Sequence, residues 1–344
     1  MPWNIYRLCR LFGSLPLDLK SHDAINDIGA GPLTLVSSLW ISRPDLRKVP
    51  LEIRCLDRTA AVLEAGKKFF SALVAETNRN APDDERAPCP WVIRIIRGEL
   101  KQNGRLSEEI RGKPAALSAA VNVYNELFWA FSPFDREGIS NLAERQVRLL
   151  SSLTESSGSV LVVEPGIPRS GEFISLLRSG LIREGRLPLS PCVHSEQCPL
   201  PGSRTGTSRR AGNTQKTKTG WCHFAFDTED APEELHTLSA AAGIPKERAV
   251  LSFILAGPAS DRAGKKPGST KAPEQSEKIR VISDSFPVGN RSSRGRYGCC
   301  ESGLVLVTGS RESLERSPSG TLEELPIAPG LTDAKSGALM AIKN

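Results

Sequence analysis

Apolar and polar residues alternate in two different periods through the first half of the chain. Short apolar or alternating runs predict strands, and longer stretches with helical apolar spacing lie between most of them. A strand, a glycine turn and a helix are predicted within 24–40, further strands at 51–56, 91–96, 116–123 and 158–164, and further helices at 60–73, 139–150 and 171–181. Strands and helices that alternate in this way predict an α/β fold with a doubly wound, mostly parallel sheet.

The first predicted strand ends in a glycine turn that is typical of a cofactor site. Asp27 closes the strand, and Gly29 and Gly31 allow the backbone to approach a ligand closely. The second strand ends at Asp57, where folds of this kind bind ribose hydroxyls. A site for a nicotinamide dinucleotide would need a third glycine where Thr34 stands. We therefore predict an S-adenosylmethionine site at Asp27, Gly29, Gly31 and Asp57.

Two features of the first half depart from the pattern of an active methyltransferase. A glycine that often follows in this turn is replaced by Leu33, which weakens the prediction of tight cofactor binding. The fourth predicted strand leads into Asn122, Tyr124, Asn125 and Glu126, without an Asn/Asp-Pro-Pro-aromatic motif. No catalytic acid–base pair is named, although methyl transfer can proceed mainly by positioning its reactants. The sequence is therefore compatible with an active methyltransferase and with one that has lost its activity.

The second half concentrates soft metal ligands in one short region. Cys192, His194 and Cys198 lie in a stretch stiffened by prolines, and Cys222 and His223 open a short predicted strand over 222–226. Thiolates and imidazoles gathered in this way predict a metal centre. The chain has 8 cysteines. Without a secretory signal, they favour reduced thiols and ligands over disulfides.

Charge and the remaining composition indicate partners and location. The 344 residues include 45 Lys and Arg against 39 Asp and Glu, and much of the basic excess lies in the second half, in the polar segments 201–220 and 257–277 and at Arg291, Arg294 and Arg296. Such loops suit a polyanion, and they equally suit solvated flexible loops. No apolar run approaches the roughly 20 residues of a membrane span, and the N-terminus lacks signal-peptide architecture. We expect a monomeric cytoplasmic protein without membrane contact, or a mitochondrial protein in a eukaryote.

The cysteine motifs resemble those of the ribosomal small-subunit methyltransferase-like family, which has mitochondrial members and bacterial relatives. The similar elements are Pro191-Cys-Val-His-Ser-Glu-Gln-Cys-Pro-Leu200, Trp221-Cys-His-Phe224, a strand at 250–253, Arg280-Val-Ile282 and a late Cys-x-x-x-Gly. The resemblance covers roughly residues 24–308. Its cysteine motifs are much more specific than the glycine turn.

This resemblance carries implications for fold, partners and ligands. It implies a class I S-adenosylmethionine-dependent methyltransferase fold, binding to the small ribosomal subunit and its RNA during assembly, and a [4Fe–4S] cluster. Its ligands would be Cys192, Cys198, Cys222 and Cys299, with Cys300 as the alternative to Cys299. Zinc stays open as an alternative to the cluster, because four thiolates suit both. The two histidines are then expected to support the ligands.

These patterns together predict three regions of the chain and are compatible with three functions. We expect a methyltransferase-like domain over 1–185, a cysteine region with added strands and basic loops over 186–310, and a flexible tail over 311–344. The functions are a ribosome assembly factor, an active ribosomal RNA methyltransferase with a structural cluster, and a zinc-stabilised protein-interaction module. The absent catalytic motif favours the first over the second. The cysteine resemblance favours both over the third.

Overall fold

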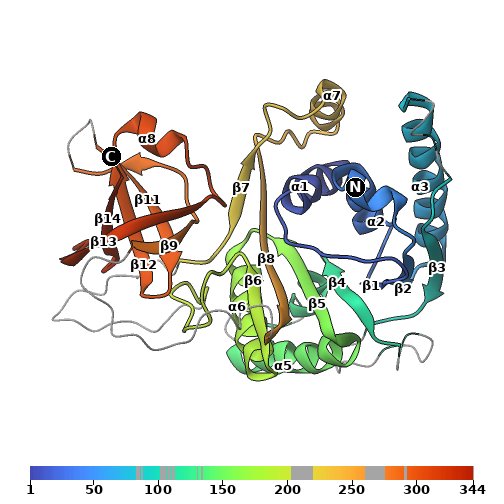
Figure 1. The fold of residues 1–344 in the computed structure, drawn as a ribbon, viewed down its shortest axis with the longest axis horizontal. Coiled ribbons are helices and arrows are strands. Elements are labelled where there is room, and N and C mark those ends of the chain that lie inside the picture. The colour runs from blue at the N-terminus through green and yellow to red at the C-terminus, as the bar shows by residue number, and fades with distance from the viewer. Residues whose placement is uncertain are drawn as a thin grey trace. The chain divides into compact units, whose positions relative to one another are not determined.

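A computed structural model shows the fold of the chain (Figure 1). It describes residues 1–82, 86, 88–100, 106, 110, 113–129, 131–132, 135–202, 220–259, 276–289 and 293–343. The chain forms two compact units, which differ from the division at residue 185 that we expect from the sequence. The first unit is Met1–Glu164 with Phe226–Val250, and the second is Pro165–Ala225 with Leu251–Asn344. Within the described residues, no helix has both the length and the apolar character needed to cross a membrane.

The first unit follows the predicted alternation of strands and helices. Its elements are α1 (Pro2–Phe12), β1 (Ala24–Ile28), α2 (Thr34–Ser42), the 3-10 helix η1 (Pro44–Lys48), β2 (Glu52–Asp57), α3 (Ala60–Asn80), β3 (Val92–Arg97), β4 (Ala115–Val121), α4 (Tyr124–Phe128), α5 (Arg136–Ser152), β5 (Thr154–Pro165) and α7 (Glu233–Ala241). All five predicted strands of the first half are confirmed, with shifted ends. Helix α1 is an addition that the apolar spacing did not predict.

The five strands form a parallel sheet in the order β3-β2-β1-β4-β5. All five residues of β1 are buried, since a parallel sheet is covered on both faces. Parallel strands bring their carboxyl ends to one edge, which is where ligands bind in such sheets. The mostly parallel sheet is confirmed, and its strand order is that of doubly wound α/β folds that bind nucleotides.

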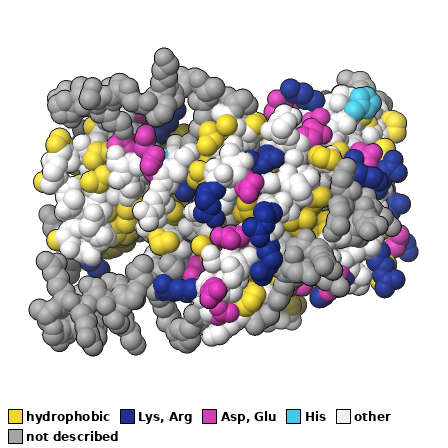
Figure 2. Space-filling view, turned by 90° about the horizontal axis from the view of Figure 1, so that it is seen from below, with side chains coloured by type: hydrophobic (Ala, Val, Ile, Leu, Met, Phe, Trp, Pro, Cys, Tyr) yellow, Lys and Arg dark blue, Asp and Glu magenta, His cyan; other side chains and the backbone are white. Residues whose placement is uncertain are grey.

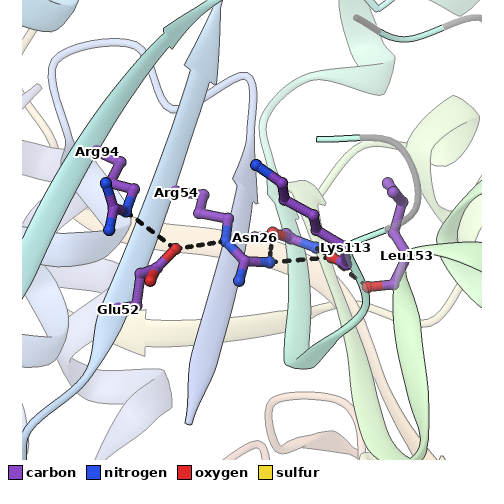
Figure 3. Close-up of polar contacts among 6 residues, drawn as sticks. All are labelled: Asn26, Glu52, Arg54, Arg94, Lys113 and Leu153. Carbon is purple, nitrogen blue, oxygen red and sulfur yellow. Dashed lines mark hydrogen bonds and ion pairs between the residues drawn. The ribbon is translucent and has the colours of Figure 1, made fainter. Parts of the chain in front are cut away.

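A polar network fixes the other edge of this sheet, near the amino ends of the strands (Figure 3). The buried Asn26 of β1 donates from Nδ2 to the carbonyl oxygen of Lys113, 3.2 Å away, and Arg54 of β2 donates to the same oxygen at 3.0 Å. Glu52 accepts from Arg54 and also pairs with Arg94 of β3 at 3.1 Å. These contacts join neighbouring strands, so this edge has a structural role.

The remaining helices and strands belong wholly or in part to the second unit. They are α6 (Pro168–Arg183), β6 (Arg186–Ser190), β7 (Phe224–Asp227), β8 (Arg248–Pro258), β9 (Ser276–Val281), β10 (Phe286–Pro287), β11 (Arg294–Cys300), β12 (Gly303–Gly309), α8 (Arg311–Glu315), β13 (Leu322–Thr332) and β14 (Leu339–Lys343). Strand β8 pairs antiparallel with β6 and also pairs with β7. The short strand expected at Cys222 and the strand expected at 250–253 therefore have counterparts in β7 and β8.

Five strands of the second unit close into a small barrel. Their order is β9-β11-β12-β14-β13, and β13 pairs with β9 to complete the ring. Strands β12 and β14 are parallel, and α8 lies between β12 and β13 in the chain. A five-stranded barrel with the order 1-2-3-5-4 and a helix after the third strand has the topology of the oligonucleotide-binding fold.

The C-terminal segment 311–344 differs from the flexible tail that we expect from the sequence. Residues 311–343 form α8, β13 and β14, and their side chains help to build the barrel core. The core contains Ile279, Cys300, Val305, Val307, Leu314 and Ala341, with Leu325, Ile327 and Leu339 packed against it. Prolines within 322–332 hide this strand from a pattern search, because proline is rare inside sheets.

Candidate cofactor and metal sites

The glycine turn after β1 has the left-handed backbone that its sequence predicts. Gly29 and Gly31 have φ angles of 70° and 52°, and Leu33 follows with a φ of 56°. Leu33 is fully buried, so its side chain packs in the core while its backbone takes a conformation that favours glycine. The departure at position 33 therefore keeps the shape of the turn.

A cavity of about 290 Å³ lies at the carboxyl ends of β1, β2 and β4. Its lining includes Gly29 and Asp57, two of the four residues predicted to bind the cofactor. Asn122 and Glu126, which follow β4, also line it. Asp27, which lies in β1, and Gly31, which lies in the turn that follows, are not among its lining residues. Two of the four predicted residues therefore line the cavity and two do not.

The two predicted carboxylates differ in their surroundings. Asp57 accepts from the backbone N–H groups of Gly31 at 3.0 Å and Thr59 at 2.9 Å, so it ties the glycine turn to the end of β2. A carboxylate has further lone pairs for a ligand hydroxyl. Asp27 is 1% exposed, and among the described residues its Oδ2 has no hydrogen-bond partner. Burial, together with the nearby charge of Asp57, raises the pKa of Asp27 to about 8.

The ends of β4 and β5 are held by residues that sequence patterns did not single out. Glu164 accepts from the backbone N–H groups of Val123 at 3.1 Å, Tyr124 at 2.8 Å and Asn125 at 3.1 Å. Burial raises the pKa of this carboxyl group to about 8. Arg7 of α1 donates to Oδ1 of Asn122 at 2.5 Å. The side chain of Asn122 and the backbone N–H groups of the next three residues are therefore engaged within the protein.

All four cysteines that we predict as ligands line a second cavity, which lies within the second unit. Cys192 and Cys198 follow β6, Cys222 precedes β7, and Cys299 lies on β11. Cys300 faces the opposite way, into the barrel core, because successive residues of a strand point to opposite faces. The structure therefore brings Cys299 together with the other three cysteines and separates Cys300 from them.

The predicted supporting role of the histidines is clearest for His194. Its Nε2 lies 3.1 Å from Sγ of Cys299, and its side chain is 4% exposed. His223 instead stacks on Trp221 with 4.8 Å between ring centroids, and it does not line the cavity.

Arg178 of α6 is a further residue of this cavity that sequence reasoning missed. Its Nε donates to Sγ of Cys192 at 3.2 Å, and its Nη2 donates to the carbonyl oxygen of His194 at 2.8 Å. Burial raises the pKa of the Cys222 and Cys299 thiols, while the charge of Arg178 opposes the shift. Arg178 stands in an ordinary helical stretch, so only the fold reveals its position.

Basic side chains on the described surface do not form one large patch in the view of Figure 2. Lys and Arg are interspersed there with Asp and Glu. We expect the basic segments 201–220 and 257–277 to contact RNA. Most of each segment, residues 203–219 and 260–275, lies outside the described residues.

A scan against protein-family models matches residues 98–284, just over half of the chain, to the family described as mitochondrial small ribosomal subunit Rsm22. The chain belongs to the Rsm22 family. The Rsm22 match contains Cys192, Cys198 and Cys222 and ends before Cys299, while Asp57 lies before its start. Membership confirms the family resemblance of the cysteine motifs. A comparison with curated proteins found no match.

Solved structures resemble the Rsm22-family chain only in part. YjhP from E. coli is 14% identical over 49% of this chain and 51% of its own, with a TM-score of 0.27. The complex of the Haloferax volcanii Trm112 methyltransferase activator and the putative methyltransferase is 8% identical over 74% of this chain and 89% of its own, with a TM-score of 0.35. A putative S-adenosyl-L-methionine-dependent methyltransferase from Methanococcus maripaludis is 17% identical over 53% of this chain and 64% of its own, with a TM-score of 0.28. The chain spans about half the length of YjhP. These TM-scores are too low to support an argument about the fold, which rests on the order of the strands in the sheet.

Proposed function

We propose that this chain is an assembly factor of the small ribosomal subunit that holds a [4Fe–4S] cluster and binds ribosomal RNA. The observation that carries the proposal is the convergence of Cys192, Cys198, Cys222 and Cys299 on one cavity. Three separate segments of the chain supply these thiols, which serves no evident purpose unless they share a ligand. The description of the Rsm22 family supports the ribosomal part.

The donor set of four thiols fits an iron–sulfur cluster, and zinc is the alternative. Four thiolates are the usual ligands of a [4Fe–4S] cluster, and each binds a different iron atom. A zinc ion would need four sulfur atoms about 2.3 Å from one point. No group of three or more His, Cys, Asp or Glu side chains that could hold a metal ion was found among the described residues, so the proposal rests on the shared cavity and the family resemblance. The cluster, when bound, would supply a multi-metal thiolate centre that links β11 to the loop after β6.

The cavity of the first unit supports S-adenosylmethionine as a second ligand. Gly29 and Asp57 line it at the strand edge where such sheets bind nucleotides, and the buried Asp27 lies in β1, two residues before Gly29. Arg7 donates to Asn122, and Glu164 accepts from three backbone N–H groups. These contacts favour a scaffold that binds the cofactor over an active methyltransferase.

Metal analysis of anaerobically purified protein tests the cluster, with neighbouring cysteines as a matched pair. We expect about four iron atoms and equivalent acid-labile sulfide per chain, loss of most iron in Cys299→Ser, and retention in Cys300→Ser. The reason is that, of these two neighbouring cysteines, Cys299 lines the cavity and Cys300 does not. Stoichiometric zinc without iron would contradict the cluster. Iron loss in Cys300→Ser alone would contradict the ligand assignment.

Cross-linking to RNA tests the ribosomal part. We expect the wild-type chain to sediment with small-subunit precursors and to cross-link to their RNA with or without S-adenosylmethionine. Cys299→Ser should bind these particles less, because it disturbs the second unit. Methylated RNA that appears only with the cofactor would favour the enzyme over the scaffold, and absence from the particles would refute both.

A further inference from the structure

Two guanidinium groups face the cysteine cavity from opposite parts of the second unit. Arg178 belongs to α6 and is 3% exposed, and the partly buried Arg280 belongs to β9 of the barrel. Both line the cavity, whose other described lining residues include no Asp or Glu. The cavity therefore contains two positive charges and no carboxylate to balance them.

The hydrogen bonds of these arginines leave their charge unbalanced. Arg178 donates to Sγ of Cys192 and to the carbonyl oxygen of His194, and its Nη2 also lies 3.5 Å from Nδ1 of His194. Arg280 donates from Nε to the carbonyl oxygen of Pro191 at 3.0 Å and from Nη1 to that of Gly320 at 2.7 Å. Within the described part of the chain, neither forms an ion pair with a carboxylate. A buried cation without an anion costs several kcal/mol, so this cavity is built to receive negative charge.

A tetrathiolate metal centre supplies that charge in the right amount. Four thiolates carry four negative charges, and a core or ion with two positive charges leaves two. This net negative charge is equal in size and opposite in sign to that of the two guanidinium groups. It is the same for a [4Fe–4S] core in its oxidised form and for a divalent zinc ion, so charge matching does not depend on which metal is bound.

The contacts of Arg178 also connect two of the proposed ligands. Its Nη2 faces Nδ1 of His194, which favours the tautomer that carries the ring proton on Nε2. That Nε2 lies 3.1 Å from Sγ of Cys299, while Nε of Arg178 donates to Cys192. One guanidinium group thereby orients a thiol on the loop after β6 and, through the imidazole, a thiol on the barrel.

We propose that Arg178 and Arg280 are the counter-charges of a doubly negative tetrathiolate centre, and that Arg178 also positions Cys192 and Cys299 through direct contact and through His194. This inference rests on the proposed function, because it assumes that the four cysteines bind a metal centre. It assigns these residues a positioning role rather than a ligand role. Partners that orient metal ligands typically change metal affinity 10- to 100-fold when they are replaced.

Metal retention and reduction potential in purified variants test the proposal. We expect Arg178→Met and Arg280→Met to release metal to a chelator at least tenfold faster than wild type. In the iron-loaded protein, Arg178→Met should also lower the midpoint potential, because removing a positive charge and an N–H···S bond disfavours the reduced cluster. A tenfold change in that equilibrium corresponds to 59 mV for one electron. Arg178→Lys should keep more of the potential than of the metal retention, since it preserves charge but not the fork of donors.

The exposed Arg311 on α8, which pairs with Glu315, provides the control. Arg311→Met should leave both measurements at their wild-type values. Circular dichroism checks folding, and if Arg178→Met does not fold, Arg178→Lys and Arg280→Met decide. Metal-loaded variants with wild-type retention and potential would overturn the inference alone. Wild-type protein without iron or zinc would overturn the proposed function and this inference together.

Discussion

At the scale of single residues, Asp27 shows how a predicted cofactor residue affects stability. It is buried at the end of β1, and its Oδ2 has no hydrogen-bond partner among the described residues. Burial is the main cause that raises the pKa of its carboxyl group to about 8, and the charge of Asp57 adds to it. The folded chain therefore binds a proton here at pH values where the unfolded chain has lost it.

The pH dependence of Asp27→Asn follows from this shift. An aspartate in the unfolded chain has a pKa of about 3.9, so the contribution of Asp27 to stability is full below pH 4 and is lost as pH rises towards 8. The neutral asparagine lacks this loss. We expect the free energy of unfolding of Asp27→Asn, relative to wild type, to rise by more than about 1.4 kcal/mol, the equivalent of one pKa unit, between pH 5 and pH 8.

Urea unfolding at the two pH values measures this difference, and the exposed Asp18 supplies the control. Asp18→Asn should follow wild type at both pH values. A difference between Asp27→Asn and wild type that does not change with pH would contradict the raised pKa. The carboxyl group of Glu164 titrates in the same range, but it is present in both proteins and cancels from the comparison.

At the scale of elements, local apolar patterns predicted the parallel strands but missed α1 and the barrel. Strands β1 to β5 have compact apolar runs, because parallel strands are buried on both faces. Helix α1 buries only Leu8, Leu11 and Phe12. Its Arg7 contacts Asn122 and Val250, which are distant in sequence. Such contacts exist only after folding, so no local spacing predicts them.

Two arginines on α1 provide a matched test of this element. Arg7 donates to the carbonyl oxygen of Val250 at 3.0 Å and to Oδ1 of Asn122, whereas Arg10 is 41% exposed and pairs with the exposed Asp230. We expect Arg7→Met to cost roughly 2–4 kcal/mol in the free energy of unfolding, because buried acceptors lose charged donors. Arg10→Met should cost less than about 1 kcal/mol. Equal losses in chemical denaturation would contradict a specific role for Arg7.

At the scale of the whole molecule, the two candidate sites were predictable to different degrees. Cysteine spacing identified Cys192, Cys198 and Cys222, but the choice between Cys299 and Cys300 depends on which face of β11 meets the cavity. Sequence carries no sign of Arg178, whose position becomes visible only when α6 and the loop after β6 are packed together. The described lining residues of each cavity belong to a single unit. Each ligand is therefore expected to stabilise its own unit.

Hydrogen exchange with mass spectrometry tests this separation. S-adenosylmethionine at about 100 times its dissociation constant would add about 2.7 kcal/mol to the unit that binds it. We expect up to about 100-fold slower exchange in peptides from 24–34 and 52–58, with little change around the cysteines. Metal removal should accelerate exchange at least tenfold in peptides from 186–200 and 294–300 and leave the first unit unchanged.

Two glycine variants separate cofactor binding from general backbone strain in this experiment. A Cβ atom on Gly29 would lie 2.4 Å from Cγ2 of Val123, whereas one on Gly185 would meet nothing within 4 Å, and both glycines have positive φ angles. Gly29→Ala should abolish the protection by S-adenosylmethionine, and Gly185→Ala should retain it, because only Gly29 lines the cavity. Protection that survives in Gly29→Ala would place the cofactor elsewhere. Protection that spreads equally to the cysteine peptides would show that the two units unfold together.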